Sequence, residues 1–404
     1  MDAYARLLAD LTEAGALDEA WRGAFGRARR SAFVPETVWA ADDASPTGYR
    51  RLTRADDPAG WWGLVNADDV VVTQLDDGVG EDADDADGGS GGRGADVPVA
   101  TSSASMPSLV ATMLRHLEVT DGHTVLDIGT GTGWTTALLS ARVGDENVTT
   151  VEVDPHIASE AAKRLAAAGF APRCVVGDGL AGWPSKAPYD RIHSTAAVRS
   201  VPRAWIEQTR PGGVVVTPWG TPYANAGLLR LVTGERGGES YGRFVADVSF
   251  MWMRSERPPP VTGAAEPRSP KAPDPSDPPG LPDPPGRSEI DPDLALENVH
   301  AAFAIGLRVP GVRYAHTWDD ADPQGTFRMR LADGEGSWAS VRYEEWASES
   351  AVRQAGPRRL WEEITAARLW WEGAGRPDLT RFGVTVGSDG EQAIWLDAPG
   401  NAVS

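Results

Sequence analysis

The sequence predicts an α/β protein in which helices cover both faces of a mostly parallel sheet. Three observations support this class. Apolar runs alternate with amphipathic stretches over residues 123–220, one apolar run breaks into closely spaced glycines just before a helix, and the next run ends on an acid. We expect a three-layer sandwich as the centre of the chain, with an N-terminal helical extension and an appended small α+β domain.

The central stretch is residues 122–152, GHTVLDIGTGTGWTTALLSARVGDENVTTVE. It predicts a strand over 124–128, a glycine turn, a helix from about Trp134 and a second strand that ends on Glu152. Such a turn lets a ligand approach the backbone, and an acid at the tip of the next strand can accept ribose hydroxyls. The spacing DxGxGxG differs from the GxGxxG of a pyrophosphate site and no GK[ST] is present. S-adenosylmethionine, a nucleoside without phosphate, therefore fits better than NAD or ATP.

The chain before this stretch predicts fewer regular elements. Residues 3–30 have helical periodicity that ends before Pro35, residues 41–68 are expected to be irregular, and residues 70–75 form a strand. Residues 76–97, rich in acids and glycines, predict a mobile surface insertion or, alternatively, an acidic lid. A hydroxyl-rich segment follows, and a helix begins near Pro107.

The chain after Glu152 continues the α/β pattern. The expected elements are helices over 155–168 and 203–209, strands over 173–176, 190–197 and 211–220, and a hairpin of 228–232 with 243–253. The third strand of the sheet runs directly into Gly177, Asp178 and Gly179.

We expect four parts: an extension over 1–97, a Rossmann-like α/β domain over 98–255, a proline-rich linker over 256–293 and a C-terminal domain over 294–404. The linker should contain no regular element. The last part predicts a helix (295–305), a hairpin (326–343), a second helix (356–373) and a strand pair (381–386 and 392–397). Its seven tryptophans predict a small core, with peptide anchors as the alternative.

Composition excludes several functions. A formal charge of −20 argues against nucleic acid as a partner, and the acidic surface is either a solvated one or one for a basic partner. No apolar run of spanning length and no signal peptide are visible, so we expect a cytoplasmic protein without membrane contact. Cys174 is the single cysteine and is expected to be a buried thiol. The six histidines form no metal-binding pair, so no metal is expected. The oligomeric state stays open, with a monomer slightly favoured.

Several motifs together resemble one family. GHTVLDIGTGTGW, TTVEVD, VVGDGLAGWPSKAPYDRIHSTAA and RPGGVVVTPWG are similar to protein-L-isoaspartate (D-aspartate) O-methyltransferases, and RSAFVPE resembles the FVP segment of that family. The resemblance covers about residues 5–38 and 98–254. DIGTGTG alone would indicate only a methyltransferase of class I, whereas the combination is specific.

The resemblance implies the cofactor, the product S-adenosylhomocysteine and the site residues. Ser105, in a Ser-x-Pro element, would contact the substrate carboxylate or the surroundings of the sulfonium as the catalytic residue. The implied cofactor-binding residues are Asp127, Gly129, Thr130, Gly131, Gly133, Glu152, Val153, Gly177, Asp178 and Gly179. The implied substrate-binding residues are Ser103, Met106, Pro107, Thr195 and Ala196. Alternatively, Asp127 only caps its turn and the serines near 102–105 are ordinary turn residues.

The chain departs from the family pattern on the substrate side. Ser108 replaces the usual aromatic residue or histidine, an acidic insertion precedes the motif, and a proline-linked domain follows. The arrangement resembles the actinobacterial offshoot of the family that tailors ribosomal peptides of the lanthipeptide and graspetide types. There an ordinary aspartate in a cyclised precursor is esterified, and the ester closes to an aspartimide that persists or hydrolyses to isoaspartate. We expect the C-terminal domain and the 76–97 insertion to select the peptide.

Two other functions stay open at this point. The first is repair of isoaspartate in peptides or proteins, with an extra domain of no catalytic role. The second is a non-catalytic scaffold that binds a peptide or a partner enzyme. Neither the peptide-tailoring enzyme nor the repair enzyme is expected to need an acid–base dyad. An aspartate carboxylate has a reference pKa of about 3.9 and is already ionised at neutral pH.

Overall fold

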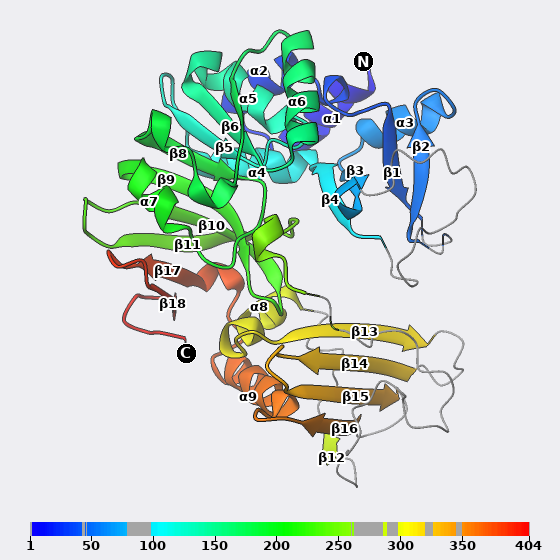
Figure 1. Cartoon of the computed structure of the whole chain (residues 1–404), viewed down its shortest axis with the longest axis vertical. Coiled ribbons are helices and arrows are strands. Elements are labelled where there is room, and N and C mark those ends of the chain that lie inside the picture. The colour runs from blue at the N-terminus through cyan, green and yellow to red at the C-terminus, as the bar shows by residue number, and fades with distance from the viewer. Residues whose placement is uncertain are drawn as a thin grey trace. The chain divides into compact units, whose positions relative to one another are not determined.

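The computed structural model describes residues 2–42, 45, 47–78, 98–259, 261, 286–288, 298–319, 326–344 and 350–403. Most of the expected 76–97 insertion and of the proline-rich segment lies outside this part of the chain. The chain forms two compact units, drawn in Figure 1. The first comprises Met1–Ala196, Val201–Thr217 and Arg230–Ser240, and the second comprises Ala197–Ser200, Pro218–Leu229 and Tyr241–Ser404.

The first unit begins with two capped helices, α1 (Ala3–Glu13) and α2 (Glu19–Arg27). Asp2 and Asp18 are their N-caps, and each carboxylate accepts a backbone N–H of the first turn. The predicted helical stretch 3–30 is thus confirmed as helical but divided in two, and it ends in a short 3-10 turn, η1 (Arg30–Ala32).

A small antiparallel sheet follows, with strand order β2-β1-β3-β4. Its strands are β1 (Thr37–Ala41), β2 (Tyr49–Thr53), β3 (Val71–Leu75) and β4 (Ala100–Ala104). The strand predicted over 70–75 is confirmed. The expectation that 41–68 is irregular is wrong, since this stretch holds β2 and helix α3 (Pro58–Val65). Strands β1 and β4 were also not predicted. These elements are short, and pairing with β3 stabilises them more than any pattern of their own.

The central sheet of the first unit has the order β9-β8-β5-β6-β7. Strands β5 (Val125–Ile128), β6 (Val148–Glu152), β7 (Arg173–Val176), β8 (Tyr189–Ser194) and β9 (Thr209–Gly220) are parallel neighbours. Helices α4 (Pro107–Leu117), α5 (Trp134–Val143), α6 (Pro155–Ala167) and α7 (Arg203–Gln208) connect or precede them. Every strand and helix predicted over 122–220 is confirmed.

The order of the strands positions the site. From β5 the chain moves outward in one direction to β6 and β7, and then in the other direction to β8 and β9. Right-handed crossovers therefore place α5 and α6 on one face and α7 on the other. The change of direction lies at β5, and ligands of open parallel sheets bind at the carboxyl ends of strands at this point. The glycine loop 129–133 follows β5 at that edge.

The second unit contains one edge of the larger sheet, in the order β18-β17-β11-β10. These strands are β10 (Asn225–Val232), β11 (Ser240–Asp247), β17 (Phe382–Val386) and β18 (Gln392–Leu396). Strands β9 and β10 contribute residues to both units. The predicted hairpin and the predicted closing strand pair are confirmed as strands.

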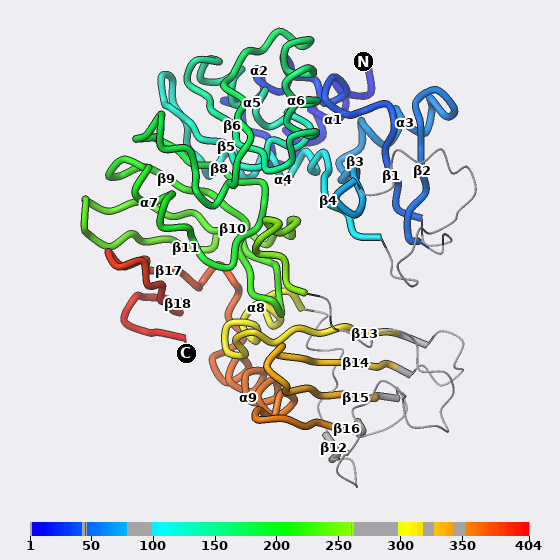
Figure 2. Tube along the Cα trace, viewed as in Figure 1, coloured from blue at the N-terminus to red at the C-terminus, as the bar shows by residue number. Residues whose placement is uncertain are grey.

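A separate antiparallel sheet completes the second unit, in the order β12-β16-β15-β14-β13. Its strands are β12 (Gly286–Ser288), β13 (Arg313–Asp319), β14 (Thr326–Ala332), β15 (Trp338–Glu344) and β16 (Ser350–Ala355). Two helices belong to the same unit, α8 (Val299–Arg308) and α9 (Leu360–Gly373), and Figure 2 traces both. The predicted hairpin and both helices are confirmed. The expectation of a linker without any regular element is wrong at β12, which pairs with β16.

The aromatic core of the second unit joins helix α8 to the larger sheet. Phe303 of α8 is 1% exposed, and its ring lies 4.7 Å from Phe244 of β11 and 6.0 Å from Trp219 of β9. Phe382 of β17 completes the cluster at 5.7 Å from Phe303. The residues after Asn298 are therefore packed into the same core as β11, and removing them would expose several large aromatic side chains.

Five of the seven C-terminal tryptophans have side chains within the described residues. Trp361, Trp371 and Trp395 are buried, as expected for a core, whereas Trp338 and Trp370 are half-buried. The side chains of Trp318 and Trp346 lie outside the described residues. Among the helices that the structure describes, none has the combination of length and apolar character that a bilayer span requires.

Candidate active site

The glycine loop after β5 adopts backbone conformations that favour glycine. Gly129, Gly131 and Gly133 have φ angles of +85°, +53° and +92°. The surroundings distinguish their roles. A Cβ on Gly129 would lie 3.0 Å from Thr195 Oγ1, and one on Gly133 would lie 3.3 Å from Leu165 Cγ, whereas one on Gly131 would meet nothing closer than 3.7 Å. Gly129 and Gly133 thus permit tight packing, whereas a Cβ on Gly131 would make only ordinary van der Waals contacts.

Glu152, at the carboxyl end of β6, is tied to this loop. Its Oε2 accepts the N–H of Gly131 at 3.0 Å and its Oε1 accepts the N–H of Asp154 at 3.2 Å. The side chain is 8% exposed. A carboxylate has up to about four acceptor directions, which suits a ribose diol beside the loop. The strand end and the glycine loop are therefore one structural unit.

Asp127 is a correction to the predicted cofactor residues. Its side chain is fully buried under the loop, where Oδ1 lies 2.9 Å from Nδ1 of His193 and Oδ2 accepts the hydroxyl of Thr136 at 2.6 Å. A carboxylate enclosed in this way cannot reach a ligand above the loop. Thr150, which also bonds to Asp127, lies 2.7 Å from the Thr130 hydroxyl. Asp127 therefore lies below the loop and contacts Thr136, Thr150 and His193; it does not cap its turn, so the structural alternative is wrong as well.

Two exposed valines flank Glu152. Val153 is 43% exposed and Val176 is 55% exposed, and Val176 is the register partner of Glu152 across β6 and β7. Gly177 follows, and a Cβ there would meet nothing closer than 3.9 Å. Apolar side chains and open backbone at the ends of two strands form a surface that a flat ring can cover.

Asp178 and Gly179 begin the short turn η4 (Gly179–Ala181) after β7. Asp178 is exposed, and its carboxylate accepts the N–H of Leu180 at 3.0 Å. The carbonyl of Gly179 accepts the indole N–H of Trp205 at 2.8 Å. These contacts fix the turn beside Val176 and keep the Asp178 carboxylate at the surface.

Strand β4 places the hydroxyl-rich segment beside the loop. The Ser103 carbonyl oxygen would lie 3.7 Å from a Cβ on Gly131, so the backbone of β4 runs close to the glycine loop. On the other side, Thr195 donates its hydroxyl to the Gly129 carbonyl at 2.8 Å. Ala196 follows Thr195 and lies 3.8 Å from a Cβ on Gly129. The structure therefore brings Ser103, Thr195 and Ala196 together around the glycines.

Ser105, Met106 and Pro107 form the turn from β4 into α4. Met106 has the N-cap position, and buried Pro107 is the first helical residue, where a missing N–H costs nothing. Ser105 is half-buried, and its carbonyl accepts a guanidinium N–H of Arg30 at 3.0 Å. The N–H of Ser108 donates to the Asp68 carboxylate at 2.8 Å. No contact of the Ser105 hydroxyl with the glycine loop is seen among the described residues.

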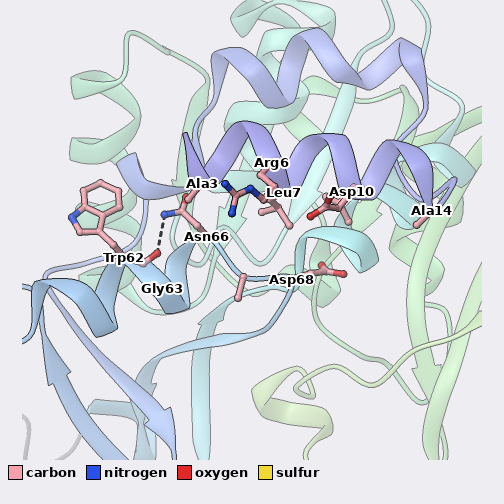
Figure 3. Close-up of a pocket in the computed structure, with 11 residues that line it drawn as sticks. Ala3, Arg6, Leu7, Asp10, Ala14, Trp62, Gly63, Asn66 and Asp68 are labelled. Carbon is pink, nitrogen blue, oxygen red and sulfur yellow. Dashed lines mark hydrogen bonds between the residues drawn. The ribbon is translucent and has the colours of Figure 1, made fainter. Parts of the chain in front are cut away.

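A groove of about 560 Å³ lies elsewhere on the first unit, between α1 and the end of α3 (Figure 3). Figure 3 shows Arg6 and Asp10 of α1 opposite Trp62, Asn66 and Asp68. None of the predicted site residues lines this groove. It shares one residue with the surroundings of Ser105, since Asp68 both lines the groove and binds Ser108. This groove is therefore not the nucleotide-type site.

Two other expectations concern reactive groups. Cys174 was expected to be a buried thiol, but β7 leaves it half-buried; this part of the prediction is wrong. Burial still raises the pKa of its thiol, so the group is protonated at neutral pH. Within the described ranges no three histidine, cysteine, aspartate or glutamate side chains cluster in a way that could hold a metal ion.

Val176 and Arg30 contribute to the site region but were not predicted. Val176 ends an apolar run, so the sequence predicted a core strand residue, whereas its position as the last strand residue exposes it. Arg30 is in a helical stretch rich in arginine, where a solvent-exposed side chain is the default expectation. The FVP segment next to Arg30 was the one available signal.

Comparison with known proteins agrees with this geometry. Residues 95–257 match the family model Protein-L-isoaspartate(D-aspartate) O-methyltransferase (PCMT). A protein-L-isoaspartate O-methyltransferase of Thermococcus onnurineus is 45% identical over 29% of this chain and 54% of its own length. One of Azorhizobium caulinodans is 40% identical over 38% of this chain and 70% of its own length. The chain thus spans between about half and about two thirds of the length of these relatives.

A solved structure from Plasmodium falciparum, described as a protein-L-isoaspartate O-methyltransferase in complex with S-adenosyl-L-homocysteine, is 14% identical. It matches with a TM-score of 0.45 over 63% of this chain and 99% of that chain. The range 95–257 of the family model includes β5, the glycine loop and β6 to β9, and the Azorhizobium relative is matched over 70% of its own length. The chain therefore belongs to the protein-L-isoaspartate O-methyltransferase family.

Proposed function

We propose that this protein is a carboxyl O-methyltransferase that uses S-adenosylmethionine to esterify an isoaspartyl side chain in a peptide or protein. The observation that carries the proposal is the glycine loop, tied to Glu152 on one side and flanked by β4 and Thr195 on the other. Family membership supports the same activity.

The residues present fit S-adenosylmethionine and not a phosphate-bearing cofactor. The glycine loop, which has no side chains at positions 129, 131 and 133, would take the methionine part, Glu152 suits the ribose diol, and Val153 with Val176 suits the adenine ring, next to the Asp178 carboxylate. No lysine or arginine stands in the loop sequence 129–133 to neutralise a phosphate. Bound there, the cofactor supplies a methyl group on a positively charged sulfur, which a carboxylate oxygen can take up as an ester.

The tasks of the protein follow from that chemistry. The acceptor carboxylate is ionised at neutral pH, so no general base is needed. Ser105 would orient the carboxylate through its hydroxyl, while Ser103, Met106, Thr195 and Ala196 would form the surrounding wall and Pro107 would fix the turn. Holding the two reactants in line and keeping water out are the main contributions to the rate.

Mass spectrometry tests the activity directly. Purified protein with S-adenosylmethionine and a synthetic isoaspartyl peptide should yield the peptide methyl ester, and the matched peptide with ordinary aspartate should stay unchanged. If calorimetry detects no binding of S-adenosylmethionine, the isoaspartyl proposal fails and the result favours the scaffold function. If the cofactor binds but neither peptide gains a methyl group, the isoaspartyl proposal fails.

A second candidate substrate is an ordinary aspartate in a cyclised ribosomal peptide. Two observations favour it: Ser108 stands where the family has an aromatic residue or histidine, and the second unit carries a sheet, β12 to β16, outside the 95–257 match. After esterification the next backbone nitrogen of the substrate could displace methanol and close an aspartimide. That step needs no group from the protein.

The second candidate needs point variants and not a truncation, because Phe303 packs against Phe244 and Trp219. Arg328 and Arg330 lie on β14 on the face away from buried Phe327 and Met329. If the C-terminal sheet selects the peptide, replacing both arginines with serine should reduce methylation of a cyclised precursor and leave the isoaspartyl peptide unaffected. An equal effect on both substrates would contradict this role, and so would no effect.

A further inference from the structure

Arg30 is a charged residue with no exposed surface, and its surroundings are made of backbone oxygen atoms. Its two terminal nitrogens donate to five carbonyl groups. The acceptors and distances are Val65 (3.2 Å), Ala67 (3.2 Å), Asp69 (2.6 Å), Ala104 (2.8 Å) and Ser105 (3.0 Å). These carbonyls belong to two segments, 65–69 and 104–105, which are far from Arg30 and from each other in the sequence.

A second link joins the same two segments. The Asp68 carboxylate accepts the N–H of Ser108 at 2.8 Å. The turn from Ser105 to Ser108 is therefore held at both ends, by Arg30 on the carbonyl of Ser105 and by Asp68 on the amide of Ser108. Backbone contacts of this kind fix the position of the Ser105 side chain without touching it.

The chemistry of this site requires arginine. The two terminal nitrogens of a guanidinium carry four N–H groups in one plane and reach both segments, whereas a lysine ammonium has three donors on one atom. The Nε–H of Arg30 has no hydrogen-bond partner among the described residues. Burial lowers the pKa of Arg30 to about 10, so the side chain stays charged at neutral pH. Carbonyl dipoles stabilise that charge, and so does the ring of Trp134, whose centroid lies 5.5 Å from the guanidinium carbon. Trp134 is the first residue of α5, directly after Gly133.

We propose that Arg30 is a positioning residue for methyl transfer. Through its contacts with Ser105 and Trp134 it holds the Ser105 turn in a fixed position relative to the glycine loop. This inference rests on the proposed function. The guanidinium connects the substrate side, through the carbonyl of Ser105, with Trp134 at the beginning of α5 on the cofactor side. Displacing the turn by about 1 Å would cost catalysis about 100-fold without removing any group that touches a reactant.

Arg191 offers a matched control. It is also buried, at 8% exposure, and donates to the carbonyls of Leu117 at 2.6 Å and Glu118 at 2.8 Å. These carbonyls lie at the carboxyl end of α4, whereas Arg30 binds just before its amino end. Arg30→Lys and Arg191→Lys therefore make the same chemical change at opposite ends of one helix.

The experiment compares both variants with the full-length protein. Turnover of the isoaspartyl peptide is normalised to the sites that bind S-adenosylhomocysteine, so that loss of folded protein does not count as loss of rate. For Arg30→Lys we expect kcat/KM to fall by about 10 to 100-fold and the amides of residues 105–109 to exchange hydrogen faster. For Arg191→Lys we expect neither change. Equal kinetics and equal amide exchange in the two variants would overturn the proposal.

Two outcomes need a separate design. If Arg30→Lys does not fold, Asp68→Ala tests the other end of the turn. This variant should exchange the amide hydrogen of Ser108 faster and lower kcat/KM by about threefold or more. Unchanged exchange and unchanged kcat/KM would show that the turn is not a positioned element. If the wild-type protein methylates no peptide, the proposed function fails. The exchange data still decide whether Arg30 holds the turn.

Discussion

The cofactor side of the candidate site lies on one continuous stretch, residues 125–181, whereas the substrate side is assembled from distant segments, such as Arg30 and Ser105, which are 75 positions apart. On the cofactor side the ligand surface is largely backbone and strand ends. On the substrate side a half-buried turn depends on Arg30 and Asp68. The difference teaches that a local motif can fix what the protein binds, while distant residues fix where the second reactant is held.

The largest effect is expected from Glu152→Ala. Two hydrogen bonds from ribose hydroxyls to a carboxylate, each worth about 1.5–3 kcal/mol, would disappear, and the tie to Gly131 would be lost as well. We expect the dissociation constant of S-adenosylmethionine to rise by about 100-fold or more, measured by calorimetry. Glu207→Gln, an exposed acid on α7, serves as the control. If the dissociation constant rises by less than about threefold, Glu152 does not bind the cofactor.

Ser105→Ala tests the other side of the comparison. Because the hydroxyl would contact only the substrate carboxylate, we expect turnover of the isoaspartyl peptide to fall by about 10 to 100-fold with cofactor affinity unchanged. Thr120→Ala, which removes a hydroxyl beyond the far end of α4, is the matched control. Normal turnover would exclude Ser105 from the site, and a parallel loss of cofactor binding would show that the two sides are not separable.

Val176→Ser tests the apolar surface for the adenine ring. A valine that is 55% exposed contributes little to the folded core, so the free energy of unfolding should stay unchanged. Covering the side chain with a ring is worth about 1 kcal/mol, so the dissociation constant of S-adenosylmethionine should rise about fivefold. Titration at equilibrium measures this, and Val232→Ser, on β10, provides an exposed control. Equal affinities of the two variants would place the ring elsewhere.

The smallest effect concerns the opposite edge of the sheet. Burial alone would raise the pKa of Asp190, but two hydrogen bonds from Thr124 and the charge of Arg210 lower it overall. A lowered folded-state pKa stabilises the protein above the unfolded value of about 3.9. The stability advantage over Asp190→Asn should therefore shrink as the pH falls below about 4, measured by urea unfolding. A difference independent of pH would show that the carboxylate charge is not the cause.

The sequence predicted the central sheet and the glycine loop because each depends on local runs. The apolar run before Gly129 and the acid at Glu152 are visible without knowledge of any partner strand. Strand β12 was missed because three residues pair with β16 only through the tertiary fold. Helix α3 was missed because its eight residues include two glycines, although Asp57 caps it and Trp61 and Val65 are buried one turn apart.

The site residues show the same limit. Thr195 and Ser103 were predicted and lie beside the glycine loop, whereas Asp127 was predicted and lies below it. Spacing alone cannot distinguish an acid that faces a ligand from one that faces His193. Arg30 could not be assigned from the sequence, because its partners are carbonyl groups, which every residue carries.

The position of β17 beside β11 has a consequence for biosynthesis. Strand β11 ends at Asp247, and the strand that covers its edge begins at Phe382, so roughly 130 further residues have to leave the ribosome before that edge is paired. An unpaired edge is a template for association with other chains. Nascent or prematurely terminated chains should therefore depend on chaperones. Substitutions near Phe382 should lower the expression yield although they leave the candidate active site intact.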